Sequence, residues 1–205
     1  MATAATPPLV IRPLTPERWP DLEAVFGARG CSVARRCWCM YYRLSGGDAF
    51  GSMQGGEHAQ SRKTQLQSLV EARRPPGLVG YRATDFAPVG WVSLGPRADF
   101  ARLVRSPVMK AVDDRPVWSI VCFVVPSPLR GQGVARALLD GAVEYARLQG
   151  ATVLEAYPVD RVEPSNAESM WFGAKTMYDQ AGFREVARRK PERPVVRLEL
   201  GATQG

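Results

Sequence analysis

The sequence feature that most constrains the fold is a nearly uninterrupted apolar run at residues 117–125, which ends at Pro126. A run of this length is typical of a central strand that is buried on both faces. A helical pattern of apolar residues begins at Val134 and stops at Gly150, and a second apolar run covers residues 151–158. A strand, a helix and a strand in this order form a βαβ unit, so the two strands should run parallel.

Further elements surround this unit and complete one predicted domain, residues 1–205. They are a strand at 9–14, a helix that begins at Thr15 and Pro16, a helix at 57–73, strands at 78–84 and 88–96, a helix from the Ser165/Glu168 capping box to Gly182 with Met170, Trp171, Ala174 and Tyr178 on its apolar stripe, and strands at 183–188 and 194–200. The strands at 78–84 and 88–96 should form an antiparallel hairpin, and the last two strands a second antiparallel pair. The predicted fold class is therefore α/β with a mixed sheet.

The turn that follows the first strand of the βαβ unit, Arg130-Gly131-Gln132-Gly133, favours phosphate binding. The helix that starts there has N–H groups without a helical partner and the positive end of its dipole at the turn. Glycines let a phosphate approach these amides without meeting a Cβ, and Arg130 adds a positive charge. The dinucleotide fingerprint G-x-G-x-x-G would need a third glycine where Arg136 stands, so the pattern excludes a Rossmann site.

The net charge of +7 favours an anionic partner. A nucleic acid, a membrane surface and a phosphorylated small molecule are the three alternatives. The basic residues are scattered and form no clustered recognition helix, so we expect no nucleic-acid partner. No apolar run approaches the ~20 residues of a membrane span, and the N-terminal residues lack the features of a signal peptide. We therefore expect a cytoplasmic protein without a membrane partner.

Three of the four cysteines lie close together in the irregular segment 29–56, as Cys31, Cys37 and Cys39, and the fourth is Cys122. Cytosolic thiols stay reduced, so we expect no disulfide. The C-x5-C-x-C spacing fits no zinc pattern, and we expect no metal. These thiols are better interpreted as small buried hydrophobic groups. Together with the aromatic residues of the segment they predict a pocket wall or lid, formed with Trp38, Tyr41 and Tyr42.

Two separated motifs resemble those of a known family. Arg130, Gly133 and Ala135 form an R-x-x-G-x-A pattern after the strand, and residues 178–183 form a Y-x-x-x-G-F pattern. Together with the order of the elements, they resemble the GNAT superfamily of N-acetyltransferases, which depend on acetyl-CoA. The resemblance implies a mixed, mostly antiparallel sheet with helices on both faces and one parallel pair of strands that is splayed to hold the coenzyme.

The resemblance also implies a coenzyme site. The pyrophosphate would contact the amides of the glycine turn, and the pantetheine arm would pair with the main chain of Phe123 and Val125 as an added strand does. An amide near Cys122 would face the developing oxyanion. The residues implied for the coenzyme are Cys122, Phe123, Val124, Val125, Arg130, Gly131, Gln132, Gly133, Val134, Ala135 and Arg136.

Tyr178 is the general acid that the resemblance implies. A phenol with a pKa of about 10 can give a proton to the departing thiolate if it lies within hydrogen-bond reach of the sulfur. A second interpretation stays open, in which Tyr178 is a core aromatic whose hydroxyl bonds a carbonyl. Glu155 and Asp160 are the candidates for the general base, and loss of the proton to solvent is the alternative. Many relatives carry asparagine where this chain has Trp171.

We therefore expect an acetyl-CoA-dependent N-acetyltransferase that acetylates a primary amine of a small molecule or peptide by direct transfer in a ternary complex. Segments 29–56 and 96–116 would form the acceptor side, and a homodimer is possible. The alternative is a non-catalytic acyl-CoA-binding or sensor module on the same fold. The aromatic segment hints at an acceptor with an anionic or flat group, near a rim formed by Arg35, Arg36, Arg43 or Arg97.

Overall fold

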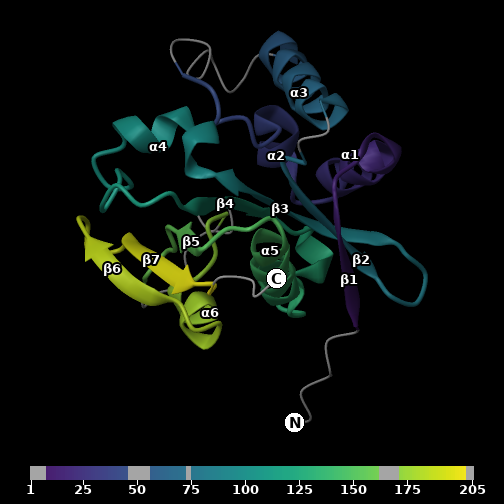
Figure 1. Ribbon diagram of the computed structural model, residues 1–205. Helices are drawn as coiled ribbons and strands as arrows, with labels where there is room; N and C mark the ends of the chain where they lie inside the picture. Colours follow the sequence, from purple (N-terminus) through teal and green to yellow (C-terminus); the bar gives the residue numbers. More distant parts are fainter. Residues whose placement is uncertain (1–7, 46–55, 73–74, 162–170, 202–205) are drawn as a thin grey trace.

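The computed structural model describes residues 8–45, 56–72, 75–161 and 171–201, and these form one mixed α/β structure around a seven-stranded sheet (Figure 1). The strand order is β1-β2-β3-β4-β5-β7-β6. The strands are β1 (Leu9–Pro13), β2 (Gly77–Arg82), β3 (Pro88–Pro96), β4 (Trp118–Val124), β5 (Val153–Ala156), β6 (Arg184–Arg188) and β7 (Pro194–Glu199). The helices are α1 (Trp19–Gly27), α2 (Ser32–Cys37), α3 (Gly56–Glu71), α4 (Ala101–Arg105), α5 (Val134–Leu148) and α6 (Lys175–Gln180).

The predicted parallel pair is confirmed. Within the described residues β4 and β5 run parallel, and every other pair of neighbouring strands is antiparallel. The parallel register joins only Trp118–Ile120 to Leu154–Ala156. β4 continues along β3 as far as Val124, which pairs with Trp91. The second half of β4 therefore has β3 on one side and no strand on the other.

Helices cover both faces of the sheet because the strand residues alternate between two apolar clusters. Leu78 and Val92 pack with α5 on one face. Their sequence neighbours Val79 and Trp91 pack with α1 and α3 on the opposite face. Figure 1 shows α5 and α6 on one side of the sheet and α1, α2 and α3 on the other. This alternation confirms the predicted mixed sheet between two helical layers.

Three sequence predictions differ from the structure. Segment 29–56 was predicted to be irregular but contains α2, whose six residues are too few to show a helical period. Segment 96–116 likewise contains α4. The last helix is shorter than predicted: the capping-box residues Ser165 and Glu168 lie outside the described residues, and residues 171–174 are not helical. Gly173, with φ of +78°, departs from helical geometry, so Trp171 and Ala174 are not on the stripe.

The C-terminal end of α5 also departs from the expected pattern. Leu148 continues the helical pattern of apolar residues, yet it is 69% exposed, whereas Ala146 of the same turn is fully buried, so the side chain of Leu148 faces away from the core. The buried stripe of α5 consists of Val134, Leu138, Leu139, Ala142 and Ala146.

Gly141 allows α5 to pack closely against β1. A Cβ at this position would lie 2.7 Å from side-chain carbons of Ile11. Gly141→Ala should therefore lower the free energy of unfolding by roughly 1–3 kcal/mol through overpacking, although alanine is the better helix former. Urea unfolding measures this change. Gly27→Ala is the matched control, because nothing lies within 4 Å of a Cβ there. A Gly141→Ala protein at least as stable as the original chain would contradict the close packing.

Candidate active site

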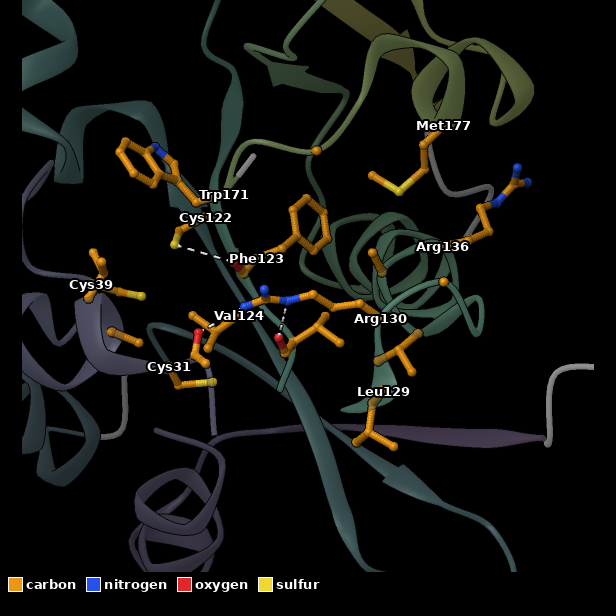
Figure 2. A pocket seen from close by; sticks show the side chains of 18 of the residues that line it. Cys31, Cys39, Cys122, Phe123, Val124, Leu129, Arg130, Arg136, Trp171 and Met177 are labelled. Carbon is orange, nitrogen blue, oxygen red and sulfur yellow. Dashed lines mark hydrogen bonds between the residues drawn. The ribbon is translucent and has the colours of Figure 1, made fainter. Parts of the chain in front are cut away.

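A cavity of about 1210 Å³ lies where β4 separates from β5. Its walls come from the second half of β4, the turn that precedes α5, the segment around α2, and α6 (Figure 2). This volume exceeds the ~300–1,000 Å³ of typical small-ligand sites. Every residue predicted to bind the coenzyme lines this cavity except Gln132, whose side-chain amide donates to the carbonyl of Pro128 at 2.7 Å.

The glycine turn at one end of the cavity presents the start of α5. Gly131 and Gly133 have left-handed backbone angles, with φ of +75° and +77°, which favour glycine. Gly133 is the N-cap of α5, and no side chain caps this helix end. A Cβ on Gly131 would meet nothing within 4 Å. The space over the turn is therefore open, and the first amides of a four-turn helix lie beside it.

Arg130 spans the cavity from this turn to the opposite wall (Figure 2). Its Nε donates to the carbonyl of Val125 at 3.1 Å, and its Nη2 donates to the carbonyl of Gly30 at 2.8 Å. Gly30 lies so close to the segment after β4 that a Cβ there would be 2.7 Å from the Cβ of Ser127. One guanidinium thus connects the end of β4 with the connection between α1 and α2.

Trp171 forms a hydrogen bond with the free edge of β4 at one point. The amide of Phe123 donates to the carbonyl of Trp171 at 2.6 Å. Among the described residues, the Phe123 carbonyl accepts a weak thiol contact from Cys122, at 3.8 Å. A chain that paired along this edge would have to replace the Trp171 carbonyl at Phe123.

Tyr178 is buried and does not line the cavity, although Thr176, Met177 and Gln180 of the same helix do. Its hydroxyl donates to the carbonyl of Phe172 at 2.9 Å. Burial raises the pKa of this phenol, so it is uncharged at every ordinary pH. Here Tyr178 has the contacts of a core aromatic, which was the second interpretation of its sequence position.

Glu155 is buried in a charged network away from the cavity lining. Its carboxylate accepts hydrogen bonds from Arg97 at 3.1 Å and from Arg197 at 2.8 Å. It also accepts one from the hydroxyl of Tyr157 at 2.6 Å. Arg97 donates in turn to the carbonyls of Leu103 and Met109. Glu155 therefore anchors segment 96–116 to the sheet.

Asp160 lies outside the cavity lining as well. Its carboxylate accepts a hydrogen bond from Arg188 of β6 at 2.7 Å, in a half-exposed ion pair. The structure thus does not bring Tyr178, Glu155 and Asp160 together at the cavity. The arginine partners of Glu155 and Asp160 are distant from them in sequence, so local patterns do not reveal these ion pairs.

Segment 29–56 forms one wall of the cavity, and all three of its cysteines line that wall. The lining includes Cys31, Cys37, Cys39, Tyr41 and Tyr42, and Cys122 joins them from β4, so all four cysteines of the chain face one cavity. Trp38 instead stacks on the ring of Trp19 in the core, with 5.7 Å between centroids. No group of three or more His, Cys, Asp or Glu in the described parts of the chain is arranged to hold a metal ion.

The four arginines expected at the rim point elsewhere. Arg43 is buried, donates to the carbonyls of Pro76 and Leu94, and lies over the ring of Phe100. Arg97 belongs to the Glu155 network, and Arg35 donates to the carbonyl of Gly27. Arg36 is exposed, and none of the four lines the cavity. The lining residues that lie outside segment 29–56 and that the sequence did not indicate are Leu129, Gly173, Thr176, Met177 and Gln180.

The chain belongs to the acetyltransferase (GNAT) family, whose model matches residues 42–183. The fold and both sequence motifs agree with this membership, which confirms the resemblance. No curated protein matches the sequence. No helix within the described residues is long and apolar enough to cross a membrane.

Solved structures with the same fold are distant in sequence. A GNAT-family acetyltransferase described as putative, from Desulfovibrio desulfuricans, has 16% identity and a TM-score of 0.52, and the match covers 95% of this chain and 100% of that one. An acetyltransferase from Thermus thermophilus has 17% identity and a TM-score of 0.52, covering 96% and 99%. The paia N-acetyltransferase from Thermoplasma acidophilum, solved in complex with coenzyme A, has 14% identity and a TM-score of 0.50, covering 94% and 99%.

The position of Glu155 predicts a loss of stability when its charge is removed. Glu155→Gln should lower the free energy of unfolding by roughly 3–5 kcal/mol, because it leaves the guanidinium groups of Arg97 and Arg197 without their shared buried carboxylate. Urea unfolding tests this. Asp160→Asn removes a more exposed ion pair and should leave stability nearly unchanged. Equal effects of the two changes would argue against an anchoring role.

Proposed function

We propose that this chain is an acetyl-CoA-dependent N-acetyltransferase, which moves an acetyl group to a primary amine of a small molecule or peptide by direct transfer in a ternary complex. The observation that carries the proposal is that one cavity contains both the open start of α5 and the half of β4 that lacks a strand partner on the β5 side. The start of α5 can bind a phosphate through its amides, and the open edge of β4 can form hydrogen bonds with an extended ligand. The cytoplasm, where acetyl-CoA is available, is the location that we propose.

The residues at the cavity fit the coenzyme. Left-handed glycines at 131 and 133 leave the amides open to a pyrophosphate, and Arg130 and Arg136 are the charged lining residues that flank these amides in the sequence. Without a ligand the guanidinium of Arg130 bonds the carbonyls of Val125 and Gly30, and that of Arg136 pairs with Asp140, so both would turn toward the pyrophosphate on binding. The edge of β4 from Cys122 to Val125 would hold the pantetheine arm by main-chain pairing. In this arrangement the coenzyme supplies the acetyl thioester, and the chain orients it.

The remaining chemistry needs an uncharged amine and a proton for the departing thiolate. Tyr178 could donate this proton after its hydroxyl leaves the carbonyl of Phe172. Glu155 and Asp160 are held by arginines, so neither carboxylate is free to take the amine proton. We therefore propose that the amine loses its proton to solvent before transfer.

The alternative, a non-catalytic acyl-CoA-binding or sensor module, has one observation in its favour. The hydroxyl of Tyr178 and the carboxylates of Glu155 and Asp160 are all engaged in bonds away from the cavity. A sensor would need the coenzyme site and none of these groups.

Release of the coenzyme thiol from acetyl-CoA in the presence of amines separates the two functions. We expect amine-dependent release by the original chain, and a loss of about 10²–10⁴-fold in kcat for Tyr178→Phe if the phenol is the acid. Coenzyme binding, measured by calorimetry, should be the same in both proteins. Binding without release on any amine would support the sensor.

The glycine turn predicts a specific effect on coenzyme affinity. Gly131→Ala places a Cβ in the open space and strains a left-handed residue by about 1–2 kcal/mol. Gly150→Ala is a matched control, because Gly150 has φ of +77° and the same open surroundings at the other end of α5. Both variants should lose similar stability, and only Gly131→Ala should bind coenzyme A at least about tenfold more weakly by calorimetry. Equal affinities would contradict the site.

A further inference from the structure

The side chains that line the cavity differ in charge between its two ends. Its charged lining residues, among those that the structure describes, are Arg130 and Arg136 at the glycine turn, and no Asp or Glu belongs to that lining. The opposite end is formed by neutral sulfur-containing and aromatic side chains. We call it the thiol–aromatic chamber, and its residues are Cys37, Cys39, Tyr41, Tyr42, Cys122 and Trp171.

The thiols of Cys37 and Cys122 in the chamber are uncharged near neutral pH. Cys39 and Cys122 lie toward each other across the cavity wall (Figure 2). The pKa of the Cys122 thiol is raised well above its ordinary value, first by its hydrogen bond with Cys39 and then by burial. Burial also raises the pKa of Cys37 to about 11. Protonated, buried thiols behave as small apolar groups, so this wall offers no charge to a ligand.

The aromatic wall of the chamber is also neutral. Tyr41 and Tyr42 meet edge to face, with 4.9 Å between their centroids. Burial raises the pKa of Tyr42, and the nearby charge of Arg193 and, to a smaller extent, a hydrogen bond with the side chain of Trp171 partly oppose this shift. The guanidinium of Arg102 lies 4.0 Å from the centre of the Tyr41 ring. A ring that already binds a cation attracts a second one less strongly, so this wall favours an aromatic face over an ammonium group.

The backbone that carries the chamber is strained. Trp38 and Cys39 both have left-handed angles, with φ of 48° and 50°, although neither is glycine. Each such residue costs about 1–2 kcal/mol, and such strain persists only where the surroundings determine it. The turn sends Trp38 into the core against Trp19 and sends Cys39 to the cavity. The position of the Cys39 thiol is therefore set by the fold.

We propose that the acceptor is a primary amine on an apolar, aromatic body, and that the chamber receives it as the uncharged free base. This inference rests on the proposed N-acetyltransferase function. A polyamine or aminosugar would bring further ammonium groups, and an amino acid would bring a carboxylate, against chamber side chains that, among the described lining residues, hold no opposite charge. Burying such groups without partners is costly.

The neutral chamber also accounts for the missing general base. An apolar site disfavours the charged form of an amine and lowers its pKa, so the proton is lost to water before or during entry. The amine nitrogen then attacks the thioester carbonyl carbon, the C–S bond breaks, and an amide forms. One proton of the attacking nitrogen leaves, and one proton is added to the thiolate of coenzyme A, so the products are the N-acetyl amine and free coenzyme A.

Three acceptors of similar shape test the inference. They are benzylamine, 4-(aminomethyl)benzoic acid and 1,4-bis(aminomethyl)benzene, which differ by one added negative or positive group. We expect kcat/KM for benzylamine to exceed both others by at least about tenfold. Below the pKa of the amine, kcat/KM for benzylamine should rise about tenfold per pH unit, because only the free base binds. A diamine or amino acid that reacts as well as benzylamine would overturn the proposal.

A variant of the chamber provides the second test. Cys39→Asp should reverse the preference in favour of the diamine, whereas Cys39→Ala, which alters the same strained position without adding charge, should keep the preference for benzylamine. Unchanged preference in a folded Cys39→Asp protein would overturn the assignment. If that variant does not fold, the three acceptors on the original chain decide the question.

Coenzyme A binding, measured by calorimetry, distinguishes failure of this inference from failure of the proposed function. A chain that does not bind coenzyme A would refute both. A chain that binds it and prefers charged amines would refute the acceptor class alone. Binding without turnover of any of the three amines would count against both the enzyme and its acceptor.

Discussion

The site depends on the point at which β4 and β5 stop pairing. Their parallel ladder ends at Ile120 and Ala156, whereas β4 continues along β3 to Val124. Backbone groups of a buried strand need partners, so a central strand with one edge left open is a position at which an extended ligand can bond. The turn after β4 then brings the start of α5 beside the same opening. Strand separation and helix start thus define one elongated cavity.

Arginines stabilise the structure at two levels, and the first is Arg130, which connects two walls of the cavity. Below the opening, Glu155 with Arg97 and Arg197 ties β5, β7 and segment 96–116 together. A buried carboxylate that accepts from two guanidinium groups and a phenol is fully bonded, and this explains why a residue on a strand next to the cavity has a structural role. Carboxylates near such a site are therefore poor candidates for a base until their partners are known.

Much of the fold could be predicted from the sequence because its signals are local. The apolar run at 117–125, the hairpin of 78–84 and 88–96 and the glycine turn each follow from neighbouring residues, and their order fixed the parallel pair. The short helix α2 and the late start of the last helix could not be predicted, because six-residue helices show no clear period. Arg97 and Arg197 lie 58 and 42 residues from Glu155 in the sequence. The pairing of the Glu155 charge with these two arginines could therefore not be predicted from local patterns.

The bond from Arg130 to the carbonyl of Gly30 connects two walls of the cavity. An anion that draws this guanidinium toward the start of α5 removes a tether from the connection that carries Cys31 and α2. An anion at the start of α5 would thereby change the free energy of moving the connection between α1 and α2. Such coupling is reciprocal, so whatever tightens that connection must alter anion affinity by the same factor. An anion bound at the start of α5 would therefore act through this one side chain on the connection that carries Cys31.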